Sequence, residues 1–236
     1  MPHDTDTSGR LLAIGDIHGC DVALHTLLRA LKLTKEDTVV ILGDVVDRGP
    51  NTRRCLDILL DLREECRLVH LMGNHEEMFL DALQGGRWSN AWLQNGGDEM
   101  LASYGGEFDN IPSQHLDFLR SGRDYYETEL DIFVHATPHF DTPMDEQSGQ
   151  SLRWNRITGR EPPHCSGKRV ICGHTSQRGG VPLVFMGWVC LDTNVYGDRG
   201  ALSALDVLND EIYQAEQSGR FRGRFPLAAF ELARRR

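Results

Sequence analysis

The sequence lacks any long apolar run. No stretch reaches the roughly eighteen consecutive apolar residues that a membrane-spanning helix needs. The first ten residues, MPHDTDTSGR, have neither the basic start nor the apolar middle of a signal peptide. We therefore expect a cytoplasmic protein that has no membrane partner.

The sequence also has little cysteine, and the cysteines that it has are scattered. The six are Cys20, Cys55, Cys66, Cys165, Cys172 and Cys190. They form no C-x-x-C pair and no zinc-binding spacing, which favours reduced thiols over a disulfide framework or a structural zinc site. We assign them no chemical role.

Positive charge is in deficit as well. The chain has 25 Lys and Arg against 35 Asp and Glu, for a formal net charge of −10. Such a field repels nucleic acid and anionic membrane surfaces, so we expect no nucleic-acid partner. A site that binds phosphate would have to be built locally from a few basic side chains.

The size and composition favour one α/β domain that spans residues 1–236. Its 236 residues are 40% hydrophobic, enough to bury a large core. We place that core at about residues 10–216. The remaining residues, 217–236, form a basic tail with six Arg in the last seventeen positions, and we interpret it as a solvated terminal helix rather than a docking arm.

A strand–helix–strand unit repeats in the first third of the chain. RLLAIGD ends at Asp16, TVVILGD ends at Asp44 and RLVHLMGN ends at Asn74. Amphipathic stretches at 21–33 and 52–65 separate these apolar runs, with apolar residues three or four positions apart. This pattern predicts parallel strands joined by right-handed helical crossovers.

The rest of the chain predicts a helical cap followed by a second sheet. Residues 75–85 and 89–105 are helical in pattern, and we assign Trp88, Trp92 and Met100 in this region to the core. From Tyr125 onward, short strand-like runs separated by turn residues predict a second sheet packed face to face on the first. The expected architecture is therefore α/β, with two packed mixed β-sheets flanked by helices.

Polar residues collect where these strands end. Parallel strands finish at the same edge of a sheet, and ligands bind at that edge in open α/β sheets. The residues expected there are Asp16, His18, Asp44, Asn74, His75, His135 and His174. Gly-Asp alone could be a simple turn, and a lone His is more often structural. Together, however, oxygen ligands and several imidazoles are too many for one zinc and unsuited to Ca²⁺, and they favour two first-row ions that share a bridging carboxylate.

The motifs GDIHG, GDVVDRG, GNHE, a later HA and a later GHT occur in that order. This series resembles the calcineurin-like metallophosphoesterases. It is most similar to the phosphoprotein phosphatase family of serine/threonine phosphatases, including its bacterial and phage branch. The resemblance runs from about Leu11 to about Glu216, and it implies an αββα sandwich.

The resemblance also implies roles for individual residues. One metal would be held by Asp16, His18 and Asp44, and the other by Asp44, Asn74, His135 and His174, with Asp44 as the bridge. The ions would be two divalent transition metals, Mn first, with Fe or Zn as alternatives. His75 would be the general acid, Asp47 the carboxylate that orients it, and Arg48 a phosphate clamp. The segment LRWNR offers a second Arg, with Arg156 as the first choice and Arg153 as the reserve.

The reaction implied is hydrolysis of a phosphomonoester, most simply in a phosphorylated protein or a small phosphate ester. Hydroxide formed from water between the two ions would attack phosphorus in line, and His75 would protonate the departing alkoxide. Two features depart from the family pattern. Met72 stands where many members have Arg before GNHE, and the acidic segment 141–150, interpreted as a solvated loop, has no clear counterpart.

Two other functions fit part of the sequence. Symmetrical dinucleoside tetraphosphatases share the metal motifs, but they typically have Ala in place of Asp47 and NHD in place of NHE, so both positions favour a phosphomonoesterase. A metal-binding scaffold without activity is a second alternative. The intact set of His75, Asp47, Arg48 and metal ligands argues against it.

Overall fold

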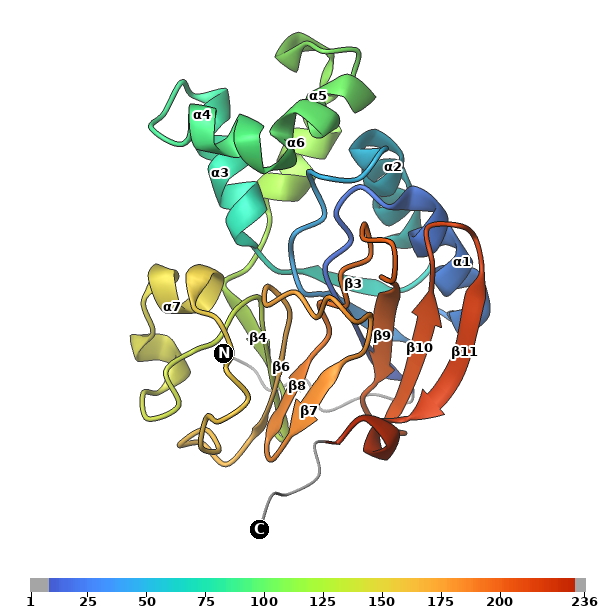
Figure 1. The fold of residues 1–236 in the computed structure, drawn as a ribbon, viewed down its shortest axis with the longest axis vertical. Helices are drawn as coiled ribbons and strands as arrows, with labels where there is room; N and C mark the ends of the chain where they lie inside the picture. Colours follow the sequence, from blue (N-terminus) through green and yellow to red (C-terminus); the bar gives the residue numbers. More distant parts are fainter. Residues whose placement is uncertain (1–8, 232–236) are drawn as a thin grey trace.

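The computed structural model of the protein describes residues 9–231, which form two β-sheets with helices on both outer sides (Figure 1). The first sheet has the strand order β11-β10-β9-β1-β2-β3 and the second β4-β5-β6-β8-β7. The strands are β1 (Leu11–Ile14), β2 (Thr38–Ile41), β3 (Arg67–His70), β4 (Tyr125–Glu127), β5 (Asp131–Val134), β6 (Arg169–Cys172), β7 (Leu183–Phe185), β8 (Trp188–Cys190), β9 (Leu202–Asp206), β10 (Glu211–Ala215) and β11 (Phe221–Pro226). Both sheets contain parallel and antiparallel pairs, which confirms the predicted mixed α/β architecture.

The repeated unit of the first third folds as predicted. Strands β1, β2 and β3 lie parallel and side by side, with Leu11 paired to Thr38 and Thr38 to Arg67. The connections are α1 (Asp21–Leu31) and α2 (Thr52–Leu62). The turns that follow the three strands therefore meet at one edge of the sheet.

The two connecting helices form because their apolar residues share one face. In α1 that face consists of Ala23, Leu24, Leu27 and Leu31, all buried. Burial of each such leucine contributes roughly 2 kcal/mol. The helix ends at Leu31 and is capped by Lys32, whose backbone is left-handed, with φ at +49°.

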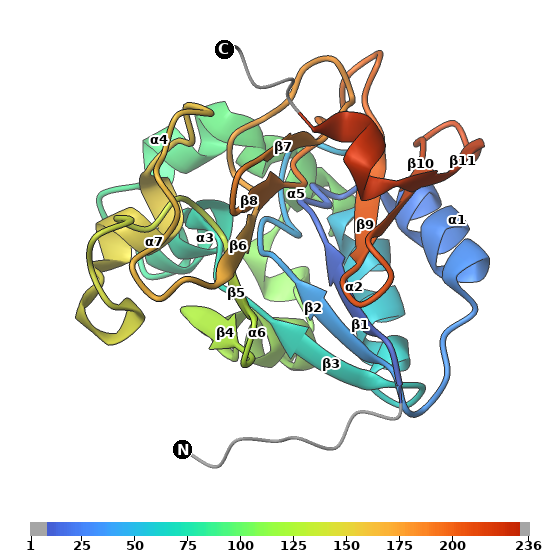
Figure 2. The ribbon, with the colours of Figure 1, turned by 90° about the horizontal axis from the view of Figure 1, so that it is seen from below.

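Side chains along the central strands point alternately to the two faces of their sheet, and this divides the core into layers. Leu12 and Ile14 of β1 face α1 and α2, whereas Ala13 faces the second sheet. On the second sheet, Ile171 of β6 faces inward and Cys172 faces outward. Figure 2 shows the first sheet between α1 and α2 on one side and strands β6 and β8 on the other. The result is an αββα sandwich.

The sequence prediction was wrong about the strands near the end of the chain. It placed every strand after Tyr125 in the second sheet, but β9 pairs antiparallel with β1, and β10 pairs with β9. Strand β9 is buried along its whole length, with Leu205 between the sheets and Ala204 toward the helices. A strand that is buried on both faces has the same apolar pattern in either sheet, so its sequence does not show which sheet it joins.

The predicted terminal helix was also wrong. Residues 221–226 form the edge strand β11, which pairs with β10 and is followed by a short 3₁₀ turn, η4 (Leu227–Phe230). Arg222 pairs with Glu216 and Arg224 with Glu211, so part of the basic tail is neutralised within the sheet. Residues 232–236 of that tail lie outside the described residues. That the whole chain is a single domain stays a prediction.

A helical cap covers the carboxyl edge of the first sheet (Figure 1). Its elements are α3 (Asn74–Leu83), α4 (Ser89–Trp92), the π-turn η1 (Leu93–Gly97), α5 (Asp98–Ser103), the 3₁₀ turn η2 (Phe108–Asn110) and α6 (Ser113–Arg120). The cap was predicted, although α6 was not. The acidic segment 141–150 is less loop-like than expected, because it holds a 3₁₀ turn, η3 (Met144–Glu146), and the start of α7 (Gly149–Trp154).

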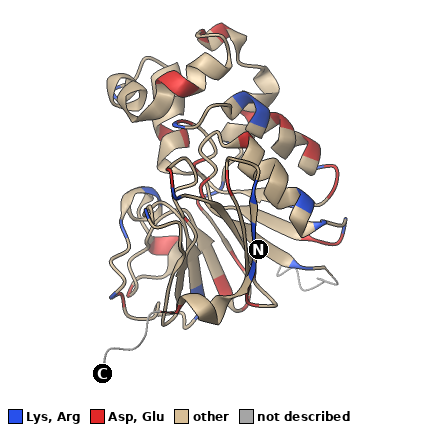
Figure 3. Cartoon of the chain, turned by 45° about the vertical axis from the view of Figure 1, so that its right-hand side comes forward, with Lys and Arg blue, Asp and Glu red and all other residues tan. Residues whose placement is uncertain are grey.

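Three further properties follow from the described residues. All six cysteines are free thiols, as expected. No helix within residues 9–231 has the length and apolar character to cross a membrane. Figure 3 shows acidic and basic residues side by side on the helices that flank the first sheet.

Candidate active site

The turns at the carboxyl edge have an unusual backbone. Left-handed φ angles occur at His18 (+43°), Asp44 (+49°), Asp47 (+70°), Arg48 (+66°) and His174 (+63°). Such a conformation costs a residue other than glycine on the order of 1–3 kcal/mol, and it persists only where the surroundings enforce it. All five positions belong to the predicted site, so the fold stores backbone strain where the chemistry is expected.

Glu76 holds two of these turns together. Its carboxylate accepts hydrogen bonds from the backbone N–H groups of Gly73 (3.0 Å), Asp44 (2.8 Å) and Val45 (2.7 Å). The side chain is completely buried, and burial, followed by the nearby Asp44, raises the pKa of Glu76 to about 7. This role of Glu76 was not predicted, because a side chain that only accepts hydrogen bonds from the backbone has no sequence motif of its own.

Three predicted imidazole ligands are oriented by backbone carbonyls. One ring nitrogen of each is hydrogen-bonded: His18 Nδ1 to Val46 O at 2.9 Å, His135 Nδ1 to Leu42 O at 2.7 Å and His174 Nε2 to Trp154 O at 3.0 Å. With its proton donated to a carbonyl, each neutral ring keeps the lone pair of its other nitrogen for the site interior. This is the arrangement that orients histidine ligands in metal centres.

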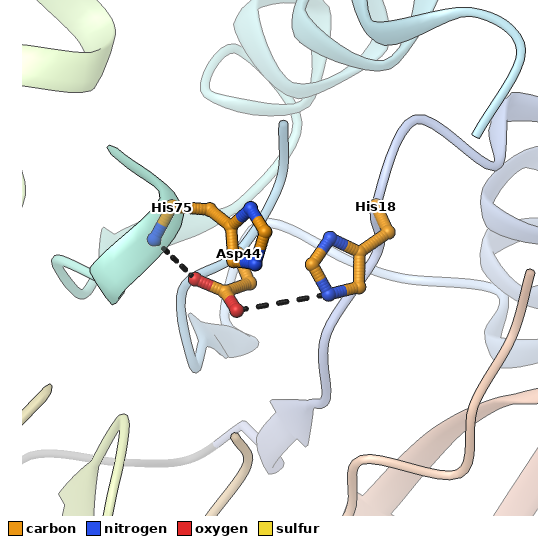
Figure 4. Close-up of side chains that lie close together, drawn as sticks. All are labelled: His18, Asp44 and His75. Atoms are coloured by element: carbon orange, nitrogen blue, oxygen red, sulfur yellow. Dashed lines mark hydrogen bonds and ion pairs between the residues drawn. The ribbon is translucent and has the colours of Figure 1, made fainter. Parts of the chain in front are cut away.

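Asp44 lies at the centre of two groups of ligand atoms. His18, Asp44 and His75 offer atoms within 4.8 Å of one another, and so do Asp44, His135 and His174. Figure 4 shows the Asp44 carboxylate between His18, at 3.6 Å from Nε2 to Oδ2, and the backbone N–H of His75, at 3.0 Å. On the other side, His135 Nε2 is 3.4 Å from Asp44 Oδ1. Asp44 belongs to both groups, and its role as a bridge stays a prediction.

The contacts of Asn74 test whether these residues suit a metal. Asn74 Oδ1 lies 3.1 Å from His135 Nε2 and 2.9 Å from His174 Nδ1. Burial lowers the pKa of both imidazoles, that of His174 to about 4, which favours neutral rings. The facing nitrogen and oxygen atoms then all present lone pairs to one another. A cation between them would remove that repulsion, so the donor set fits a metal ion.

Asp16 is held near this centre but outside both groups. Its carboxylate accepts from the backbone N–H of His174 at 3.1–3.2 Å, and a Cβ on Gly173 would come within 2.1 Å of it. Burial, then the charges of Asp192 and Asp44, raise the pKa of Asp16 well above its usual range. Sequence analysis missed Asp192. The signal was available, because Asp192 follows the apolar run of β8 as Asp16 follows that of β1.

His75 and Asp47 form a closely coupled buried pair. His75 Nδ1 lies 2.6 Å from Asp47 Oδ2, and both side chains are buried. Burial lowers the pKa of His75, but the carboxylates of Asp44 and Asp47 more than offset it, so the pKa is raised overall. This environment suits an imidazole that must carry a proton.

Arg48 lies beside His75 at the mouth of the site. One guanidinium nitrogen is 2.9 Å from His75 Nε2, and another donates to the hydroxyl of Tyr196 at 2.6 Å. The second nitrogen is also 3.3 Å from His18 Nε2. Tyr196 is partly exposed and had no place in the sequence analysis; it lies in a loop with no recognisable motif.

The two arginines of LRWNR have different surroundings. Arg153 is engaged by Glu77 at 3.0 Å and by Asp124 at 2.6 Å. Arg156 is exposed and, among the described residues, forms no hydrogen bond or ion pair, yet its charge is close enough to lower the pKa of His174. Of the two, Arg156, the first choice, is therefore the one without a carboxylate partner within residues 9–231, and its role toward a substrate stays a prediction.

The chain matches one family model and several known proteins. The family model described as calcineurin-like phosphoesterase matches residues 9–198. Serine/threonine-protein phosphatase 1 of Salmonella typhimurium is 42% identical over 86 residues, covering 36% of this chain and 38% of that protein. The symmetrical bis(5'-nucleosyl)-tetraphosphatase of Paracidovorax citrulli is 43% identical over 82 residues, covering 33% of this chain and 27% of that protein. In each case the match spans well under half of the relative's own length.

A solved structure extends the likeness to nearly the whole fold. The cold-active protein-tyrosine phosphatase of a Shewanella species superposes with a TM-score of 0.66 at 19% sequence identity, covering 90% of this chain and 79% of that one. At this level of identity the likeness concerns the fold alone.

Proposed function

The chain belongs to the calcineurin-like phosphoesterase family, and on that premise we propose that it is a metal-dependent phosphomonoester hydrolase of the serine/threonine protein phosphatase type. The observation that carries the proposal is the buried His75–Asp47 pair, with 2.6 Å between Nδ1 and Oδ2, next to the clustered ligand atoms of His18, Asp44, His135 and His174. A proton donor next to a cation-binding cluster is the equipment that hydrolysis of an alkyl phosphate needs.

The residues proposed to hold two divalent ions are those named from the motifs: Asp16, His18, Asp44, Asn74, His135 and His174. Mixed imidazole and oxygen donors of this kind suit first-row transition metals, and Mn²⁺ is the first to test. When bound, the ions would supply Lewis acidity, which polarises a phosphate and lowers the pKa of water.

The chain's own residues would do the rest. Asp47 would hold the proton of His75 Nδ1. Arg48, which contacts Nε2 at 2.9 Å, has only N–H donors, so it would turn from Nε2 to the phosphate when substrate binds, and the protonated ring would direct its Nε2–H toward the leaving oxygen. An alkoxide such as that of serine is strongly basic and leaves readily only as the alcohol. Proton donation from Nε2 would therefore accompany the breaking of the P–O bond.

Arg48 and Arg156 would bind the phosphate oxygens. Arg48 is half-buried and presents a planar fork of N–H donors, which contacts the Tyr196 hydroxyl and the imidazoles of His75 and His18. Because Met72 stands where relatives of this type often carry Arg, the site would depend more heavily on these two guanidinium groups.

Hydrolysis of symmetrical dinucleoside polyphosphates is the second candidate. Its support is the 43% identity with a tetraphosphatase over 82 residues. Against it stand Asp47 and Glu76, which the tetraphosphatases typically replace, and which here have specific partners in His75 and in the backbone of the turn after β2. The phosphomonoesterase proposal explains both residues.

A substrate panel separates the two candidates. Protein treated with a chelator and then reconstituted with Mn²⁺ would be given phosphoserine, phosphothreonine and phosphotyrosine peptides and diadenosine tetraphosphate. We expect release of inorganic phosphate from the phosphoserine and phosphothreonine peptides and little nucleotide product. Preferred cleavage of diadenosine tetraphosphate to nucleoside diphosphates would instead establish the second candidate.

A further inference from the structure

The helical cap reaches into the candidate site through one side chain, Trp92. Its indole Nε1–H donates to Asp47 Oδ1 at 2.9 Å, while the other oxygen of the same carboxylate contacts His75 Nδ1 at 2.6 Å. Trp92, Asp47 and His75 are all buried. The three groups therefore form one chain, from a cap helix, through a turn of the first sheet, to the proposed proton donor.

The surroundings of Trp92 fix the indole in place. The ring packs against Phe79 at 5.5 Å and Phe108 at 5.7 Å between centroids. A Cβ on Gly97 would come within 2.4 Å of the indole, so the absence of a side chain there lets η1 cross the ring closely. Trp92 is thus held by packing contacts that do not depend on Asp47.

The cap also contacts the same turn through its backbone. The carbonyl of Gly96 accepts from the backbone N–H of Arg48 at 3.0 Å, and Gly96 itself is left-handed, with φ at +103°. A Cβ at Gly96 would lie 2.4 Å from that same Arg48 nitrogen. Side chain and backbone of residues 92–97 therefore bind two consecutive residues of the turn, Asp47 and Arg48.

A carboxylate with only one hydrogen-bonded oxygen can rotate about its Cβ–Cγ bond. A second donor on the other oxygen removes that freedom and directs the first oxygen at its partner. Asp47 is fully buried, and the indole N–H is the donor that performs this for its carboxylate. Loss of the N–H would leave Oδ1 unpaired and the alignment of Oδ2 with His75 undefined.

We propose that Trp92 is a positioning residue for catalysis: it acts through Asp47 to hold His75 in the orientation that protonates the leaving group. The inference rests on the proposed role of His75 as proton donor. It gives the cap a purpose beyond covering the sheet edge, because the cap then sets the geometry of the proton-transfer chain.

The substitution Trp92→Phe removes the N–H and keeps an aromatic ring for Phe79 and Phe108. With Mn²⁺-loaded protein, we expect turnover of a phosphoserine peptide to fall about 10-fold, the effect of one hydrogen bond to a charged group. Hydrolysis of an activated aryl phosphate, which needs no proton donor, should change less than about twofold. Combined with Asp47→Asn, the two losses should not add, because both act through the same carboxylate.

Trp188→Phe is the matched control. Trp188 is also fully buried and donates its indole N–H, at 2.9 Å, to the carbonyl of Pro162 in another part of the fold. The Trp188→Phe variant should be less stable, but its turnover of the phosphoserine peptide should not fall more than its turnover of the aryl phosphate. A similar fall of Trp92→Phe on both substrates would show a merely structural role for Trp92 and would overturn the proposal.

A readout other than activity guards against a variant that fails to fold. In a proton–nitrogen correlation spectrum of ¹⁵N-labelled protein, Asp47→Asn should move the indole N–H resonance of Trp92 and leave that of Trp188 in place. If the Trp92 resonance did not move, Trp92 would not donate a hydrogen bond to Asp47, and the proposal would be wrong. The proposed function fails separately, if His75→Asn shows no dependence on the leaving group.

Discussion

A buried aspartate stands at each end of β2, and the two have different partners. Asp37 precedes the strand and Asp44 follows it, and each is only 2% exposed. Asp37 pairs with the guanidinium of Arg10 at 2.7 Å and accepts from the backbone N–H of Arg10 at 2.8 Å. Within the described residues, Asp44 has no Lys or Arg partner; the side chains that surround it are imidazoles.

The difference separates a carboxylate with a structural ion-pair partner from one in the candidate site. At the amino end of β2 the fold itself supplies the compensating charge, as a buried ion requires. At the carboxyl end it supplies imidazoles, of which His18, His135 and His174 have lowered pKa values and are neutral, so that further positive charge would have to come from a bound cation. The backbone differs as well, since Asp44 is in the left-handed region and Asp37 is not. A buried carboxylate without a Lys or Arg partner, such as Asp44, therefore indicates the site better than one with such a partner, such as Asp37.

The largest expected effect comes from removing the carboxylate that has no cationic partner. Asp44→Ala should abolish measurable turnover and reduce bound transition metal from two equivalents to none, because Asp44 belongs to both ligand groups and, as the proposed bridge, would serve both ions. Elemental analysis after reconstitution with Mn²⁺ measures this. Asp37→Ala is the control from the other end of β2 and should keep both equivalents. If Asp44→Ala retained two ions, Asp44 would be no more important for metal binding than Asp37 at the other end of β2.

The second effect tests whether the carboxyl end performs acid catalysis in addition to binding ions. His75→Asn should lower hydrolysis of a phosphoserine peptide by about 10²–10⁴-fold and affect an activated aryl phosphate much less. Metal content should stay at two equivalents, and Asp47→Asn should give the same pattern in milder form. Equal losses on both substrates, with the ions still bound, would make His75 a binder of transition-state charge instead.

The third effect concerns Arg48, whose guanidinium contacts the imidazoles of His18 and His75. Arg48→Ala should weaken inhibition by inorganic phosphate by about 10-fold and lower turnover, because the guanidinium binds oxygens present in both product and transition state. The phosphate inhibition constant measures it. Inhibition equal to that of the unaltered protein would mean that Arg48, like Arg10, is a structural ion-pair partner.

The smallest expected effect is a loss of stability on substitution of Asp37, at the amino end of β2. Burial raises the pKa of Asp37, but hydrogen bonds from Arg10 outweigh it, so the pKa is lowered in the folded protein. The stabilisation is therefore present above the unfolded pKa of about 3.9 and is lost as pH falls through the lower folded value. Asp37→Asn should reduce the free energy of unfolding by about 1–2 kcal/mol at pH 7.

Denaturant unfolding across the acid range checks this prediction. The difference between the unaltered protein and Asp37→Asn should shrink as Asp37 becomes protonated, since neutral Asp and Asn then resemble each other. A difference that stays constant from pH 7 to the acid end would show that the charge of Asp37 contributes nothing.

Short-range patterns in the sequence determined the core of the fold and the residues around the site. Apolar runs closed by Gly and a polar residue placed Asp16, Asp44 and Asn74 at one sheet edge, because parallel strands must end together. Helical periodicity gave α1, α2 and most of the cap. These features depend on residues a few positions apart in the chain, so the local sequence is enough to predict them.

The tertiary structure decided what depends on residues far apart in the chain. It assigned β9 and β10 to the first sheet, because a strand buried on both faces fits either sheet by its pattern alone. It engaged Arg153 in ion pairs and left Arg156 open. It also brought Trp92, which looks like an ordinary core residue in the sequence, across a separation of 45 residues to Asp47. Such a hydrogen bond is set by how the cap packs on the sheet, and no local pattern encodes that packing.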